Sequence, residues 1–240
     1  MKKVLLIGAS GLIAPHIIPS LEPHCDLYLA DIKPHPEGRP VQRVDVTDYA
    51  QVRHAADGMD AILNFTVNRP HPAHTFHVNT LGAFHVMKAA AEAGVRKVIH
   101  TGPAMVLGWY DHDFDVAEAP HAPSTYYYFL TKHLSYRLVE SFARTYRIPT
   151  LCYLFTQLRH RPAPTESMLS AHPFTIFFND LADACRQGIE LSEVPGYYQE
   201  FNLHSLDGQD RYTLEKAKRL LGYAPRTPIR EYFGRENTNS

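Results

Sequence analysis

Near its start the chain alternates between a short, fully apolar run and a longer segment with apolar residues at helical spacing. Residues 4–7 form an unbroken apolar run, as expected for a strand that is buried on both faces of a parallel sheet. A turn with glycines at 8 and 11 follows directly, and a helical segment continues through Leu21. This order of strand, tight turn and helix predicts the opening unit of an α/β fold.

Later segments extend the pattern. Strands are predicted at 26–30, from Ala61 to Asn64 and near 151–154, and a helix is expected from 79 to 93. In the first helix, Pro15 fits the first turn. Pro19 is expected to shorten or kink that helix, because proline lacks the backbone donor that a helix interior requires.

Tyr128 and Lys132 carry the chemistry that the sequence indicates most directly. Residues four apart on a helix share one face, so the phenol would lie beside the ammonium. A neighbouring cation favours the ionised phenol, which could then exchange a proton with a substrate hydroxyl or carbonyl. A lone Tyr-x-x-x-Lys is more often an ordinary helix surface, so this interpretation depends on the rest of the chain.

The glycine-containing turn and the acid after the second strand supply that setting. Gly8 permits a sharp turn, and Gly11 lets backbone amides approach a pyrophosphate at the helix N-terminus. Asp31 follows about 20 residues later, where dinucleotide-binding folds hold the adenosine ribose. Its charge would repel a 2'-phosphate, which favours NAD over NADP, while Lys33 and Arg39 keep NADP as the alternative.

These features together resemble the extended short-chain dehydrogenases/reductases, also called the NAD-dependent epimerase/dehydratase family, over nearly the whole chain. The turn with Gly8, Gly11 and Ala14 is similar to the family's Gly-x-x-Gly-x-x-Gly/Ala, and Tyr128 and Lys132 match its acid/base pair. Further similar segments are Asn79-Thr80-Leu81-Gly82, 179–184 and 220–225. The resemblance implies a Rossmann-type doubly wound parallel sheet with a small C-terminal substrate-binding lobe.

The resemblance also implies a set of cofactor-binding residues. Lys132 would hold the nicotinamide ribose, and the segment that begins at Asp45 would contact adenine. The expected residues lie in the glycine turn, after the strands and at a helix start: Gly8, Ser10, Gly11, Leu12, Ile13, Asp31, Asp45, Val46, Asn64, Phe65, Thr66 and Asn79, together with Tyr128 and Lys132.

One departure from the family pattern bears on catalysis. The usual catalytic serine or threonine falls on Pro103, which has neither a hydroxyl nor an amide hydrogen to orient a substrate oxygen. Thr101 is the nearest substitute, although a buried threonine at a strand end is commonly bonded to backbone. Ser124 and Thr125, just before the tyrosines, are the other candidates.

Within the family, the chain is most similar to sugar-oxidising members of the uronate dehydrogenase type. The stretch Gly108-Trp109-Tyr110 follows the hydroxyl-bearing strand in the same way, and the strand at 151–154 leads to a loop with Arg159 and Arg161. These arginines could grip the carboxylate of an acidic sugar. The alternative is a solvated basic loop without a ligand.

Length and composition agree with one compact unit. With 240 residues, 45% of them hydrophobic, the chain can bury a large core without covalent cross-links. We expect a single NAD-binding domain over 1–240, with substrate-lobe insertions at about 155–178 and 192–240. A formal net charge of -1 offers no electrostatic case for nucleic acid or an anionic membrane, which leaves a small-molecule substrate.

Cysteines and histidines add two further expectations. Cys25, Cys152 and Cys185 are odd in number and widely spaced, which suits reduced thiols in the cytoplasm. His71, His74 and His77 could share one helical face, but Pro70 and Pro72 argue against a helix over His71, and no nearby acid or cysteine completes a ligand set. We therefore expect no metal there, and a loop that lines the mouth of the active site.

The helix after Lys132 has apolar residues around most of its surface, including Tyr136 and Tyr146. The stripe Leu134, Leu138, Val139 and Phe142 would mainly pack on the sheet. The apolar residues around the rest of the helix also suit the helix-to-helix dimer contact of the resembling family, which predicts a homodimer.

Two functions remain. The first is an NAD(P)-dependent oxidoreductase, epimerase or dehydratase that acts on a sugar or sugar-derived hydroxyl, with Tyr128 as the acid/base. The second is a dinucleotide-binding sensor or scaffold with little turnover, because Pro103 replaces the usual hydroxyl. Oxidation and epimerisation begin with the same hydride removal, so the sequence does not separate them.

Overall fold

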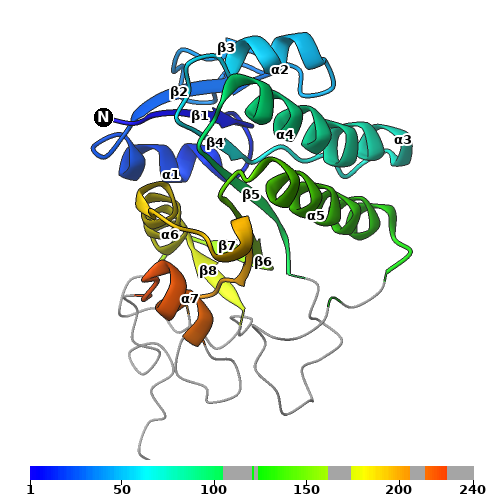
Figure 1. Cartoon of the computed structure of the whole chain (residues 1–240). Coiled ribbons are helices and arrows are strands. Elements are labelled where there is room, and N and C mark those ends of the chain that lie inside the picture. Colours follow the sequence, from blue (N-terminus) through cyan, green and yellow to red (C-terminus); the bar gives the residue numbers. More distant parts are fainter. Residues whose placement is uncertain (105–120, 122–123, 162–173, 206–213, 226–240) are drawn as a thin grey trace, which may run out of the picture.

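The computed structural model describes residues 1–104, 121, 124–161, 174–205 and 214–225 (Figure 1). At its centre lies a seven-stranded sheet in the order β3-β2-β1-β4-β5-β6-β9, with every neighbouring pair parallel. Its strands are β1 (Lys3–Ile7), β2 (Asp26–Asp31), β3 (Gln42–Arg43), β4 (Ala61–Asn64), β5 (Lys97–Pro103), β6 (Thr150–Phe155) and β9 (Tyr198–Asn202). A second, small parallel sheet consists of β7 (Gln157–Arg159) and β8 (Thr175–Phe177).

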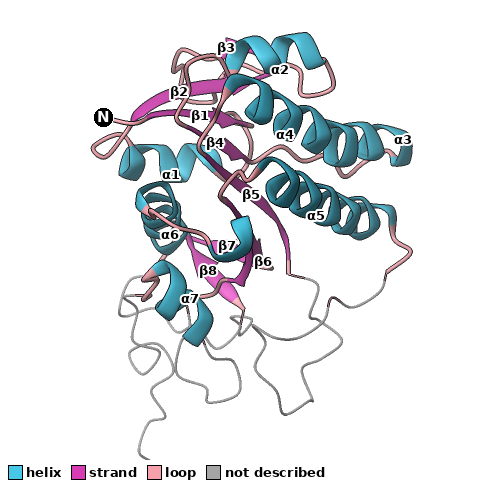
Figure 2. Ribbon diagram, in the orientation of Figure 1, coloured by secondary structure: helices cyan, strands magenta, loops and turns pink. Residues whose placement is uncertain are grey.

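Helices pack on both faces of the large sheet (Figure 2). One face is covered by α1 (Ala14–Leu21) and α6 (Phe178–Glu190), and the other by α2 (Tyr49–Ala55), α4 (Gly82–Ala93) and α5 (Tyr127–Tyr146). The other described helical elements are short: α3 (Pro72–Thr75), the π-helix η1 (Phe76–Leu81), the 3-10 helix η3 (Pro195–Tyr197) and α7 (Glu215–Leu221). The predicted doubly wound α/β fold is confirmed.

Strand β1 shows why an unbroken apolar run is stable here. Val4 and Leu6 point into the core that includes α1 and α6, whereas Leu5 and Ile7 point into the core of α2, α4 and α5. All four side chains are buried, because successive residues of a strand face opposite sides of a sheet that is covered on both.

The strand order fixes where a ligand would bind. The chain moves outward from β1 through β2 to β3, then returns and moves outward through β4, β5 and β6 on the other side of β1. In open parallel sheets, the crevice at such a reversal point opens at the carboxyl ends of the strands. The predicted glycine turn after β1 and Asp31 at the end of β2 both lie at this edge.

The segment after β4 differs from its prediction. The loop expected around His71, His74 and His77 is wrong from Pro72 onward, because α3 begins at Pro72 and continues through η1 into α4. His71 is the residue before this helix. Proline at the first helical position costs no hydrogen bond, since the first backbone N–H groups of a helix have no partner within it. Pro19 also lies inside a helix, and α1 ends two residues after it.

Tyr136 on α5 is fully buried and cannot contribute to a surface contact. Its hydroxyl donates to the carbonyl oxygen of Pro103 at 3.1 Å. A Cβ on Gly102 would lie 1.9 Å from that hydroxyl oxygen, so glycine leaves the space that the tyrosine fills. The end of β5 is therefore fastened to α5, one helical turn beyond Lys132.

All three cysteines, Cys25, Cys152 and Cys185, are buried and free of disulfides. Within the described ranges, no helix is both long and apolar enough to cross a membrane.

Candidate active site

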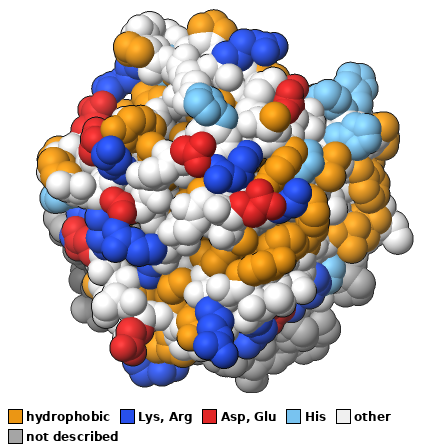
Figure 3. All heavy atoms as spheres, turned by 45° about the horizontal axis from the view of Figure 1, so that its top comes forward, with side chains coloured by type: hydrophobic (Ala, Val, Ile, Leu, Met, Phe, Trp, Pro, Cys, Tyr) orange, Lys and Arg blue, Asp and Glu red, His pale blue; other side chains and the backbone are white. Residues whose placement is uncertain are grey.

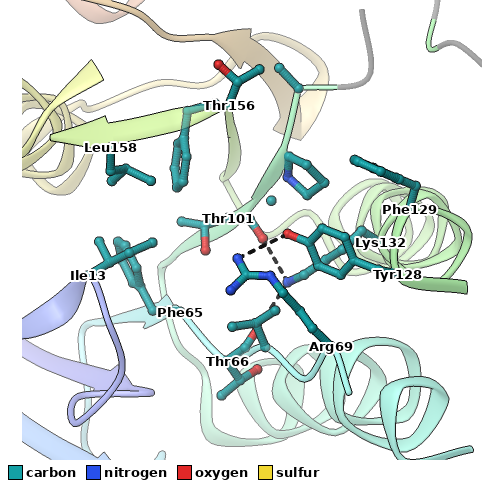
Figure 4. Close-up of a pocket in the computed structure, with 15 residues that line it drawn as sticks. Ile13, Phe65, Thr66, Arg69, Thr101, Tyr128, Phe129, Lys132, Thr156 and Leu158 are labelled. Atoms are coloured by element: carbon teal, nitrogen blue, oxygen red, sulfur yellow. Dashed lines mark hydrogen bonds between the residues drawn. The ribbon is translucent and has the colours of Figure 1, made fainter. Parts of the chain in front are cut away.

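A cavity of about 290 Å³ lies at the carboxyl ends of β4, β5 and β6, beside the first turns of α5 (Figure 4). Tyr128 and Lys132 both line it, as the sequence predicts for two residues on one helical face. The described residues around it are Ile13, Phe65, Thr66, Val67, Arg69, Thr101, Gly102, Pro103, Ala104, Tyr128, Phe129, Lys132, Phe155, Thr156 and Leu158.

Lys132 crosses from α5 to the sheet and is almost fully buried. Its Nζ donates to the carbonyl oxygens of Thr66 at 3.0 Å and Thr101 at 3.1 Å. Burial, with a smaller contribution from the positive charge of Arg69, lowers the pKa of Lys132 to about 8. An ammonium has three donors, so one N–H remains for an oxygen of a bound ligand.

Arg69 is a residue of this site that the sequence analysis did not identify. Its Nη2 lies 3.5 Å from the hydroxyl oxygen of Tyr128, and its guanidinium carbon lies 5.0 Å from the centre of that ring. Figure 4 shows the guanidinium directed toward the tyrosine hydroxyl, inside the ring of lining residues. The only signal in the sequence was a basic residue shortly after the carboxyl end of a central strand, where parallel sheets place ligand contacts.

The candidate catalytic hydroxyls occupy different places. Thr101 lines the cavity, but its buried Oγ1 donates to the carbonyl oxygen of Asn64 at 2.9 Å. Ser124 accepts from the backbone of Tyr126, and neither it nor Thr125 is among the described residues that line the cavity. Pro103 lines it directly.

A second cavity of about 190 Å³ shares Phe65, Thr66 and Val67 with the first, so the two adjoin along the strand ends. Its lining includes most of the residues predicted to bind the cofactor: Gly8, Ser10, Gly11, Asp31, Asp45, Val46, Phe65 and Thr66. Gly8 has a φ of +90°, and a Cβ there would lie 2.8 Å from the carbonyl carbon of Phe65. Glycine alone lets the turn lie this close to the end of β4.

Asp31 is held in place at the wall of the second cavity. One carboxylate oxygen accepts from the backbone of Ser10 at 3.0 Å, and the other accepts from the backbone of Lys33 at 2.9 Å. Lys33 also lines this cavity, whereas Arg39 pairs with Glu22 and Glu37.

The other predicted cofactor residues differ in placement. Ile13 lines the first cavity, and Leu12 is exposed. Asn64 is buried, and its side-chain oxygen accepts from the backbone and hydroxyl of Thr66 at 3.1 and 2.7 Å. Asn79 is also buried and bonded to other protein groups. In the structure as it stands, both asparagines therefore position the residues that line the cavities.

The predicted substrate arginines lie outside the described lining of the first cavity. Leu158 of β7 lines it, and Arg159, the next residue, is exposed. Arg161 has its Nη2 3.4 Å from Oδ1 of Asp180. Their role in binding a substrate stays a prediction. The stretch Gly108-Trp109-Tyr110 lies outside the described residues.

The described residues contain no group of three or more histidine, cysteine or acidic side chains placed to hold a metal ion. His74 lines the second cavity, and His71 precedes α3.

A sequence profile of the NAD dependent epimerase/dehydratase family matches residues 4–160. The chain therefore belongs to this family.

Two curated relatives are named uronate dehydrogenase. The protein from Pseudomonas syringae pv. tomato is 31% identical over 137 residues, which is 52% of this chain and 48% of that protein. The protein from Pseudomonas putida is 33% identical over 133 residues, which is 52% of this chain and 50% of that protein. The chain thus spans about half the length of the curated relatives it matches.

Solved structures of low sequence identity share the fold. A mutated uronate dehydrogenase superposes with a TM-score of 0.79 at 20% identity, covering 95% of this chain and 82% of that one. MoeE5 in complex with UDP-glucose and NAD superposes with a TM-score of 0.75 at 17% identity, covering 96% and 95%.

Proposed function

We propose that this protein is an NAD-dependent oxidoreductase that acts on a hydroxyl of a sugar or sugar acid. The observation that carries the proposal is the position of Tyr128 and Lys132 in one cavity that adjoins a second cavity lined by Gly8, Gly11 and Asp31. A proton-transfer pair next to a dinucleotide groove is the arrangement that hydride transfer requires. The uronate dehydrogenase relatives support a sugar acid as substrate.

The second cavity fits NAD. Gly8 and Gly11 leave the turn after β1 open to a pyrophosphate, and Asp31 presents fixed carboxylate oxygens where the adenosine ribose hydroxyls would lie. Its negative charge favours NAD over NADP. Structural neighbours solved with NAD support the same choice.

The residues of the first cavity would transfer the proton of the substrate hydroxyl. Tyr128 would accept it from the substrate hydroxyl as the C–H bond breaks, and the buried ammonium of Lys132 would support the phenolate and hold the nicotinamide ribose with its remaining N–H. When bound, NAD supplies the hydride acceptor. We propose that β7, β8 and the residues near them form the substrate side of the site, since Leu158 already lines the cavity.

The direct test combines the purified protein with NAD or NADP and a panel of sugars, uronic acids and nucleotide sugars. We expect NAD to be reduced, as measured by the absorbance of the reduced cofactor. A uronic acid should be among the substrates, and NADP should support slower turnover than NAD. Product analysis would detect epimerisation, in which the carbon is reduced again before release. Binding of NAD without turnover or epimerisation of any substrate would contradict the proposal.

That negative outcome would support a second candidate, a dinucleotide-binding sensor with little turnover. Two observations favour it: Pro103 lies at the cavity wall without a hydroxyl, and the hydroxyl of Thr101 is already bonded to the carbonyl oxygen of Asn64.

We also propose that the protein forms a homodimer through α4 and α5. Figure 3 shows hydrophobic side chains gathered on the side of the molecule where these helices lie. The described residues there include an open groove lined by the apolar side chains Phe76, Leu81, Phe84 and Leu138 together with His77 and Thr80. Leu134 and Tyr146 are exposed nearby. Contiguous apolar surface of this kind is characteristic of a protein interface.

The dimer proposal predicts a mass in solution of about twice 27.2 kDa. Leu81→Arg, which places a charge in the groove, is expected to shift the protein toward monomer in light-scattering measurements. Tyr28→Arg, at a similarly exposed apolar position on β2, is the control and should remain dimeric. A monomeric wild-type protein at micromolar concentration would overturn the proposal.

A further inference from the structure

Arg69 has the placement of a residue that recognises an anion next to the reacting atoms. The first cavity, with Tyr128 and Lys132, is the proposed catalytic cavity. Its described lining residues carry two positive charges, Arg69 and Lys132, and no carboxylate. Lys132 uses two of its donors on backbone carbonyls, whereas the guanidinium of Arg69 rests against the ring and hydroxyl of Tyr128. At 3.5 Å, its bond to that hydroxyl is long, so a stronger acceptor would replace it readily.

The backbone before Arg69 is held by Asn79. Asn68 donates its N–H to the side-chain oxygen of Asn79 at 2.9 Å, and its carbonyl accepts from the side-chain nitrogen of the same asparagine at 3.1 Å. That nitrogen also donates to Thr131, next to Lys132 on α5, at 3.0 Å. On the other side of Arg69, the carbonyl of Pro70 accepts from the hydroxyl of Tyr127 at 3.4 Å.

The π-helix η1 is part of this arrangement. Asn79 lies within it and is almost fully buried, and its amide bonds to the segment that carries Arg69. The same buried side chain joins that segment to α5, which carries Tyr128 and Lys132. The backbone that carries Arg69 is therefore held in a fixed position relative to Tyr128 and Lys132. Its guanidinium reaches into the cavity (Figure 4).

We propose that Arg69 binds the carboxylate of the substrate and makes the site specific for acidic sugars. This inference rests on the proposed oxidoreductase function and names a specificity residue for it. A substrate hydroxyl bonded to Tyr128 would lie about 2.7 Å from the phenolic oxygen. Nη2 of Arg69 lies 3.5 Å from the same phenolic oxygen, so the guanidinium is within reach of other groups on that sugar ring. A carboxylate there could accept two parallel hydrogen bonds from the guanidinium.

A phosphate of the cofactor is the other anion with the same chemistry. The pyrophosphate would lie by Gly8 and Gly11 in the second cavity, whose described lining does not include Arg69. Arg69 lines the first cavity instead, with Tyr128 and Lys132. A role in substrate binding therefore predicts no change in NAD affinity when the guanidinium is removed.

The test uses glucuronate and glucose, which share a ring and differ in the carboxylate, with the whole 240-residue chain. Binding of each sugar to the protein loaded with NADH is measured by calorimetry, and kcat and KM are measured where turnover occurs. Arg69→Gln is expected to weaken glucuronate binding and raise its KM by about 10- to 100-fold, the loss of charge-assisted hydrogen bonds, with little effect on glucose. Arg69→Lys should recover part of the loss, because the charge remains without the planar pair of donors.

The controls separate this proposal from its alternatives. Arg96 is an exposed arginine just before β5, at the amino ends of the strands and away from the cavity. Arg96→Gln should leave the binding of both sugars unchanged. Weaker binding of NAD by Arg69→Gln would assign the residue to the cofactor and overturn the proposal. An equal loss for glucose, or a loss of glucuronate binding confined to Arg159→Gln or Arg161→Gln, would also overturn it. Binding is measured without turnover, so the two proposals can fail separately. A wild-type protein that binds glucuronate but oxidises no substrate would contradict the proposed function, and the role of Arg69 could still be measured. A wild-type protein that does not bind glucuronate would overturn the role of Arg69.

Discussion

Tyr128→Phe is expected to lower kcat by about 10²- to 10⁴-fold, the usual contribution of a positioned acid/base group. The substitution removes one oxygen from the wall of the catalytic cavity and leaves the ring in place. Gly8, Gly11 and Asp31, which line the adjoining cavity, are unchanged, so NAD affinity should remain within about twofold of the wild type. Kinetics with the best substrate of the sugar panel and calorimetry with NAD measure the two quantities.

Tyr127→Phe is the matched control, because it removes the same atom from the preceding residue of α5. The hydroxyl of Tyr127 bonds weakly to the carbonyl of Pro70 and does not line the described cavity. We expect at least half of the wild-type kcat. Comparable losses in the two variants, or a Tyr128→Phe protein that retains most of its turnover, would mean that Tyr128 does not transfer the proton.

The fold could be predicted because its signals are local. The apolar run of β1, the turn at Gly8 and the acid at Asp31 occur within the first 31 residues and define the first strand, helix and strand of a doubly wound sheet. Position 8 requires glycine because its φ is positive and because the backbone of Phe65 lies close to it. Both requirements are visible in the sequence as a glycine at the end of the first strand. The pairing of Tyr128 with Lys132 is equally local, since one helical turn brings them to one face.

The role of Arg69 could not be predicted in the same way. Its position depends on Asn79, which lies ten residues later in the sequence and reaches back through a π-helix, and on Thr131 from a different helix. Sequence patterns show neither the π-helix nor bonds between distant side chains and backbone. The same lack of long-range information explains why the sequence groups Tyr136 with residues suited to a dimer contact, although it is buried and fills the space beside Gly102.

Pro103→Ser is expected to raise kcat/KM by about 10- to 100-fold, because it supplies a donor in the catalytic cavity where the family usually has a hydroxyl. Thr101 does not provide that donor in this structure, since its hydroxyl hydrogen goes to Asn64. The carbonyl of residue 103 would still accept from Tyr136, so the end of β5 should keep its place. Steady-state kinetics on the best substrate of the sugar panel measure the change.

Pro103→Ala separates the new hydroxyl from the loss of the proline ring, and it should show no gain. Thr101→Val in the wild-type background should lower kcat by less than about threefold if the hydroxyl of Thr101 serves only β4, through Asn64. A loss of 100-fold in Thr101→Val, with no gain in Pro103→Ser, would instead assign the catalytic hydroxyl to Thr101. It would require that hydroxyl to exchange the carbonyl of Asn64 for the substrate oxygen on binding, since one O–H donates one hydrogen bond at a time.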